Sequence, residues 1–191
     1  MNGLSPRSSA PVAHFSAVAV VAIVASALSA CAPMSPMYSQ DKLPEGVKVP
    51  AGNSVAMQTV GVGEITYECR PKKDMAGQFE WVFIGPDAVL NDRNGMQVGK
   101  YFGPPATWES KDGSRITGTQ VAVAPNGAGN IPHQLVKANP ATGNGAMTGV
   151  TYIQRVATVG GIAPAMQCDS NKAGAKQNVR YQADYIFWKA S

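Results

Sequence analysis

The sequence predicts an all-β domain, a single antiparallel β-barrel or β-sandwich of about eight or more strands with short helical turns in its loops. Short runs rich in Val, Ile, Tyr, Phe and Trp recur along the chain, and several alternate between two faces as half-buried strands do. Turn-forming Asn-Gly and Asp-Gly pairs separate some of these runs. No long segment has the 3.6-residue apolar periodicity and the caps of an amphipathic helix.

The first half of the domain contains four predicted strand regions. Residues 54–60 and 63–70 are two short β-rich runs, separated by a Gly-Val-Gly tripeptide. In residues 78–86, "QFEWVFIGP", three aromatic side chains share one face of the expected strand. Residues 88–102 hold an Asn-Gly pair between apolar runs, which predicts a β-hairpin.

The second half continues the same pattern. Residues 107–125 contain an Asp-Gly pair and predict another hairpin. Residues 132–138 follow and fit either a strand or one to two helical turns, since their apolar residues would also cluster on a helix. Residues 149–159 and 178–189 complete the set, and the last of these places alternate aromatic residues on one face.

The start of the chain has the pattern of a secretory signal. Arg7 is followed by an uncharged stretch from Phe15 to Ala30, about 16 residues long. Roughly 20 apolar residues are needed to cross a bilayer core, so a transmembrane anchor is the weaker alternative. Residues 1–30 are therefore predicted to be a signal peptide, and the residues at its end make it a lipoprotein signal peptide.

The signal ends in Leu28-Ser29-Ala30-Cys31, which resembles the lipobox of bacterial lipoproteins. This resemblance implies cleavage before Cys31 and lipidation of its thiol, and several acyl chains give stable anchoring. An ordinary signal cut near Ala30 or Ala32 is the alternative. Because Ala32 and not an aspartate follows the cysteine, the resemblance implies sorting to the outer membrane, facing the periplasm. Residues 31–51 carry four prolines and predict a lipidated tether, with the β domain at 52–191.

The remaining cysteines predict one covalent cross-link. Without Cys31, an exported chain keeps an even pair, Cys69 and Cys168, which favours a disulfide. A redox pair or a metal site has little support, because there is no CxxC and His133 is the only histidine after the signal. The sequence indicates no metal and no cofactor.

Charge and composition narrow the range of partners. Charged residues make up 15% of the chain, and its net charge of +4 includes Arg7 of the signal. The basic residues are scattered, and no basic stripe flanks an aromatic platform, so nucleic-acid binding is not expected. The membrane is the expected partner, through a lipid anchor on Cys31.

Several motifs together resemble one protein family. These are "GEITYEC", "FEWVFIGPDAVLND", "VGKYFGP", "ATWES" and "GVTYIQRVATVGGIAPA", with "YQADYIFW" near the end. They resemble the domain of unknown function 3455 family (DUF3455), over roughly residues 44–188. The family comprises small exported β-rich proteins of bacteria and fungi, and the resemblance implies a fold and a compartment but no catalytic residues. The chain departs from the family pattern at Pro104-Pro105-Ala106.

The motif "ATWESKDGS" holds weak candidates for catalysis. Trp108, Glu109 and Asp112 combine an aromatic platform with two carboxylates, as glycosidases do. The structural interpretation is simpler, because Asp112 precedes Gly113 in a predicted hairpin turn, Glu109 would face solvent and Trp108 would lie in the core. His133 is a further weak candidate for a general base.

Arg155 and Trp108 are the candidate ligand-binding residues. Arg155 stands in an otherwise apolar strand, so it is expected to pair with an acid, with Glu64, Glu68 and Asp184 available, or to bind an anionic ligand. The aromatic residues are expected to be mostly core, and some of them would line an apolar pocket if the barrel is open at one end. They are Tyr67, Trp81, Phe83, Tyr101, Tyr152, Tyr185 and Trp188.

These observations predict an exported protein, lipid-anchored in the cell envelope, that serves as a non-enzymatic binding module. Its partner would be a small apolar or anionic ligand in the barrel mouth, or an envelope protein or wall polymer on the loops. The enzymatic alternative is a hydrolase or lyase, which requires Glu109, Asp112 or His133 to converge in one pocket. A purely structural envelope protein is a further alternative and predicts no pocket.

Overall fold

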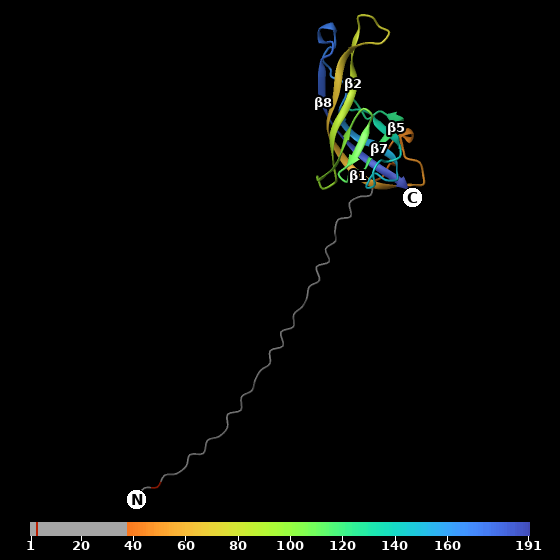
Figure 1. Ribbon diagram of the computed structural model, residues 1–191, viewed down its shortest axis with the longest axis vertical. Coiled ribbons are helices and arrows are strands. Elements are labelled where there is room, and N and C mark those ends of the chain that lie inside the picture. The colour runs from red at the N-terminus through yellow and green to blue at the C-terminus, as the bar shows by residue number, and fades with distance from the viewer. Residues whose placement is uncertain (1–2, 4–37) are drawn as a thin grey trace. The chain divides into compact units, whose positions relative to one another are not determined.

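The computed structural model describes Gly3 and residues 38–191, and residues 38–191 form one compact unit. Eight antiparallel strands close into a barrel in chain order, with the last strand pairing with the first (Figure 1). The strands are β1 (Asn53–Pro71), β2 (Phe79–Asn91), β3 (Gln97–Phe102), β4 (Thr107–Ser110), β5 (Arg115–Ala124), β6 (His133–Ala138), β7 (Val150–Gly160) and β8 (Lys176–Ala190). A short 3-10 helix, η1 (Glu45–Val47), precedes β1, and a second one, η2 (Ser170–Lys172), lies in the connection between β7 and β8. The all-β prediction is confirmed, and the sheet is a barrel.

The two predicted hairpins are confirmed. Gly95 lies in the β2–β3 turn and Gly113 in the β4–β5 turn, each with a positive φ that glycine adopts without strain. Within the predicted segment 132–138, His133–Ala138 form strand β6 between β5 and β7, so the helical alternative is wrong there. Pairing on both edges satisfies the backbone of this segment along its length, which a single helical turn would not do.

Strand β1 is longer than predicted. The expected break between residues 60 and 63 is absent, and one strand of 19 residues runs through it. The two glycines here serve close packing, since a Cβ on Gly61 would lie 2.6 Å from the ring of Tyr185 and one on Gly63 would lie 2.1 Å from the carbonyl oxygen of Asp87. Glycines in this pattern often indicate a turn, but here they allow other atoms to approach the strand backbone closely.

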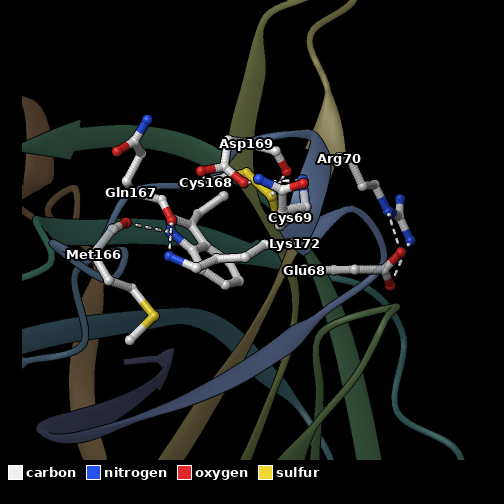
Figure 2. Close-up of a disulfide and its surroundings, with 10 residues drawn as sticks. Glu68, Cys69, Arg70, Met166, Gln167, Cys168, Asp169 and Lys172 are labelled. Atoms are coloured by element: carbon white, nitrogen blue, oxygen red, sulfur yellow. Dashed lines mark hydrogen bonds and ion pairs between the residues drawn. A yellow bond between two sulfur atoms is a disulfide. The ribbon is translucent and has the colours of Figure 1, made fainter.

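β1, β2 and the start of β8 extend beyond the rest of the barrel (Figure 1). In this extension, a disulfide joins Cys69 of β1 to Cys168, which lies in the segment before β8 (Figure 2). The indole Nε1 of Trp81 donates to the carbonyl oxygen of Met166 at 2.9 Å. The predicted disulfide is therefore present, and it holds the β7–β8 connection against the β1–β2 hairpin.

The main core lies inside the barrel. Its buried side chains alternate along the strands with residues that point outward, as the two-residue period of a strand requires. The largest of them are Trp108, Tyr185 and Phe187, which are almost completely buried.

A second apolar cluster lies on the outer face of β5–β8 and is covered by the segment before β1. Val47 and Val49 of this segment are buried there against Ile186 and Trp188. The predicted tether is thus corrected for the part that the structure describes: residues 38–50 pack on the barrel, because their apolar side chains fill this outer surface. The predicted signal peptide and Cys31 lie outside the described residues. Among the described residues, no helix is long and apolar enough to span a membrane.

Candidate ligand site inside the barrel

A cavity of about 330 Å³ lies inside the barrel, and we call it the barrel cavity. It lies at the low end of the range of roughly 300–1,000 Å³ that small-molecule sites occupy. Eight strands leave room for one small ligand when the side chains do not fill the interior. The cavity is lined by Ile65, Tyr67, Phe83, Pro86, Tyr101, Pro104, Ala106, Trp108, Gly118, Gln120, Ile131, Pro132, Gln134, Val136 and Arg155.

Stacked aromatic rings form one wall of the cavity. The rings of Tyr101 and Trp108 stack at 4.7 Å between centroids, and both lie against Tyr185, at 5.0 and 6.0 Å. Trp108 and Tyr101 are cross-strand partners on β4 and β3, which brings them face to face. The buried indole Nε1 of Trp108 has no hydrogen-bond partner among the described residues. Such orphaned donors are rare in folded proteins.

Two further aromatic residues lie where the cavity opens. Tyr67 of β1 is opposite Phe83 of β2, and their rings meet edge to face at 6.2 Å. Phe83 is 53% exposed although its side chain lines the cavity. Phe83 is therefore one of the aromatic residues that line the pocket and not one of the core residues, because β2 extends past the barrel here and no layer of the described chain covers the ring. Tyr152 and Trp188 belong to the outer cluster.

Arg155 lines the same cavity as Trp108. Along β7, Ile153 contributes to the inner core, while Gln154 and Val156 face the outer cluster, so the alternation places Arg155 inside. Its Nε and Nη2 donate to the carbonyl oxygen of Pro132, at 3.3 and 3.0 Å.

The expected pairing of Arg155 with an acid is not found among the described residues. Asp184 pairs with Arg93 at 2.8 Å, and Glu68 pairs with Arg70 at 3.0 Å. Glu64 accepts a hydrogen bond from Asn178. These carboxylates therefore have other partners on the surface of the barrel, whereas Arg155 points inward.

Two glutamines, Gln120 and Gln134, complete the cavity wall, and they are not among the residues predicted for the site. Gln134 Nε2 donates to Gln120 Oε1 at 2.6 Å across the β5–β6 pair. Neither residue stands in a recognisable motif, and alternation alone does not distinguish the inner from the outer face of a short strand. The register of β6 pairs Gln134 with Arg155, and the hydrogen bond from Gln134 brings Gln120 to the same cavity.

Glu109 and Asp112 have structural partners outside the cavity. Glu109 forms an ion pair with Arg115 at 3.3 Å, directly across the β4–β5 pair. Asp112 accepts hydrogen bonds from Ser114 and from the backbone N–H of Ala146, and these lower the pKa of its carboxyl to about 2. The carboxylate thus ties the β4–β5 turn to the loop before β7.

His133 begins strand β6 and does not line the cavity. Burial lowers the pKa of its imidazole, and the positive charge of Arg155 lowers it further. The three weak catalytic candidates thus lie at separate places and do not converge in the cavity. The described residues contain no group of three or more His, Cys, Asp or Glu side chains that could hold a metal ion.

The fold and the site define a closed eight-stranded antiparallel barrel with an aromatic-lined cavity. The family model described as "Protein of unknown function (DUF3455)" matches residues 50–189. The chain belongs to this family, as its motifs predicted. Comparisons with curated proteins and with solved structures found no match.

Proposed function

We propose that this protein is a non-enzymatic binding module of the cell envelope that holds a small ligand in the barrel cavity. The observation that carries the proposal is a cavity of about 330 Å³ whose wall contains Trp108 and Tyr101 stacked on each other. A well-packed barrel of this size would fill such a space with side chains, since empty volume in a core is destabilising. A cavity with aromatic walls and few polar groups is typical of a small-molecule site.

Filling the cavity should abolish binding without unfolding the protein. Ala106 lines the cavity and is only half-buried, so Ala106→Phe adds a ring to the cavity at little cost to the core. We expect protein purified from its host's envelope to carry a reproducible extra mass in native mass spectrometry, and the Ala106→Phe protein to lose it.

The matched control is Val89→Phe, which adds similar bulk at an exposed position of β2 that does not line the cavity. This variant should retain the extra mass. Thermal unfolding of both variants shows whether each is folded. An extra mass that survives in folded Ala106→Phe protein would place the ligand elsewhere, and wild-type protein without any extra mass would argue against a tightly held ligand.

We also propose that the protein is anchored in the membrane by a lipid on Cys31, with the barrel exported and facing the periplasm. The support is the lipobox-like sequence directly after the apolar signal. Cys31→Ala should move the protein from the membrane to the soluble fraction after cell fractionation, because the thiol that would carry the lipid is gone. Ser35→Ala, a few residues downstream, should stay with the membrane. If the Cys31→Ala protein were still found in the membrane fraction, this result would contradict the lipid anchor.

A further inference from the structure

Arg155 is the one charged side chain among the described residues that line the barrel cavity. Four ion pairs join side chains elsewhere in the described part of the chain, and Arg155 belongs to none of them. Arg155 is partly buried, and burying a charge without a counter-ion costs free energy. Its position beside an open cavity therefore favours an anion as the bound species.

The guanidinium is already held in place. Its Nε and Nη2 both donate to the carbonyl oxygen of Pro132, which also lines the cavity. An arginine carries five N–H donors, so the two on Nη1 and the second on Nη2 have no acceptor among the described residues. These donors are the ones that a planar carboxylate accepts in pairs, and fixing the side chain beforehand lowers the entropic cost of binding.

Tyr101 offers a second donor in the same cavity. The residue is only 5% exposed, no hydrogen bond joins its hydroxyl to another described residue, and the hydroxyl is not among the fully buried polar atoms. Burial raises the pKa of Tyr101, and the positive charge of Arg155 partly offsets that rise, so the phenol remains protonated at neutral pH. A protonated phenol can donate to an anion, and this would complement the guanidinium.

The rest of the cavity suits a flat apolar body. Tyr67, Phe83, Tyr101 and Trp108 provide aromatic surface, and the ring of Phe83 is half-exposed where the cavity opens. A ring in the ligand would cover Phe83 and make the offset or edge contacts that aromatic pairs prefer. An inorganic anion would leave this apolar surface uncovered, and a phosphate dianion would meet a single cation here.

We infer that the ligand of the barrel cavity is a small aromatic carboxylate, whose carboxylate binds Arg155 and whose ring lies against Tyr67 and Phe83. This inference rests on the proposed function, because it specifies the ligand of the same cavity. A volume of about 330 Å³ limits the ligand to one or two fused or conjugated rings.

The inference is tested by comparing acids with their neutral amides. Benzoate, cinnamate and indole-3-acetate, each paired with its primary amide, would be titrated into the full-length protein by isothermal titration calorimetry. We expect at least one acid to bind about tenfold more tightly than its amide, which corresponds to about 1.4 kcal/mol from charge-assisted hydrogen bonds. In Arg155→Met protein this preference should disappear.

Arg180→Met is the matched control, because Arg180 is an exposed arginine of β8 that does not line the cavity. It should leave the acid preference unchanged, which separates a local contact from a general charge effect. Tyr101→Phe, which removes only a hydroxyl, should weaken the binding of the acids several-fold and should weaken the binding of the amides less. Should Arg155→Met fail to fold, the wild-type ratio and the Tyr101→Phe result still decide the question.

The possible failures are distinguishable. If acids and amides bind the wild type equally well, and Ala106→Phe blocks the binding of both, the carboxylate inference is overturned. The proposed function of the cavity as a ligand site would then still stand. An acid preference that persists in folded Arg155→Met protein would also overturn the inference. No binding of any acid or amide at millimolar concentrations would overturn the inference and count against the proposed function.

Discussion

Gln154→Leu should be among the most destabilising single substitutions in the described part of the chain. The Gln154 side chain is fully buried and makes four hydrogen bonds. Its Nε2 donates to the Val47 carbonyl oxygen and to Gln40 Oε1, at 2.7 and 3.1 Å. Its Oε1 accepts from the Tyr38 hydroxyl and from Trp188 Nε1, both at 3.1 Å. Leucine has a similar volume but can replace none of these bonds.

The expected loss follows from the partners that cannot reach water. The Val47 carbonyl and the Trp188 indole are buried, and each would be left unsatisfied at a cost of about 1–3 kcal/mol. The free energy of unfolding should therefore fall by about 2–6 kcal/mol, and the melting temperature by roughly 5–15 °C. Chemical denaturation and calorimetry measure both quantities.

Gln182→Leu provides the matched control, since Gln182 is exposed on the same strand, β8, as Trp188. It should change stability by no more than about 0.5 kcal/mol. Hydrogen exchange adds a local readout, because loss of the Gln154 bonds should release residues 38–50 before the barrel opens. Equal melting temperatures for the two variants would show that the segment before β1 contributes little to stability.

This role of Gln154 could not be predicted from the sequence. An alternating strand pattern identifies two faces but assumes that one of them meets water, and on β7 both faces are buried. The prolines between Cys31 and Pro50 predicted an extended tether because proline-rich segments favour extended conformations. Val47 and Val49 nevertheless make the end of that segment part of the fold, because the outer face of β5–β8 is itself apolar.

The elements with local signals were predicted correctly. The hairpin turns at Gly95 and Gly113 follow from residue types that adopt positive φ, a property of the turn itself. The disulfide followed from cysteine counting in a chain that is predicted to be exported. The prediction failed at Gly61 and Gly63, where the glycines allow close packing by Tyr185 and β2. No local pattern distinguishes a glycine that turns the chain from one that admits a neighbour.

The candidate site was predicted only in part, for a related reason. Arg155 was predicted as a site residue because it is a charge in an apolar strand. Trp108 was predicted because it is an aromatic residue near carboxylates. That both line one cavity depends on the closure of eight strands and on the register between β4, β5, β6 and β7. Gln134 becomes a cavity residue through its pairing with Arg155, which is a long-range property. These side chains thus share one cavity because of the topology and not because of their spacing in the sequence.

Removing the disulfide should have the other large effect. Cys69 and Cys168 are 99 positions apart, and the chain-entropy model gives a cross-link of that span about 4–5 kcal/mol of stabilisation. The double variant Cys69→Ser/Cys168→Ser should therefore melt roughly 10 °C below its parent. The comparison is made in a Cys31→Ala background, so that no third thiol can form a new pair. A melting temperature within a degree or two of the parent would show that the cross-link contributes little.

The same variant tests how the cross-link acts on the cavity. The Tyr67 hydroxyl donates to the Gly161 carbonyl oxygen at 2.7 Å, and Trp81 Nε1 donates to Met166, so two further bonds hold the β7–β8 connection on the β1–β2 hairpin. If the disulfide stabilises mainly by restricting the unfolded chain, these bonds keep the folded geometry without it. We therefore expect the double serine variant, below its melting temperature, to bind cavity ligands as its parent does. A lost affinity together with fast hydrogen exchange in residues 161–168 would instead mean that the cross-link itself holds the cavity in shape.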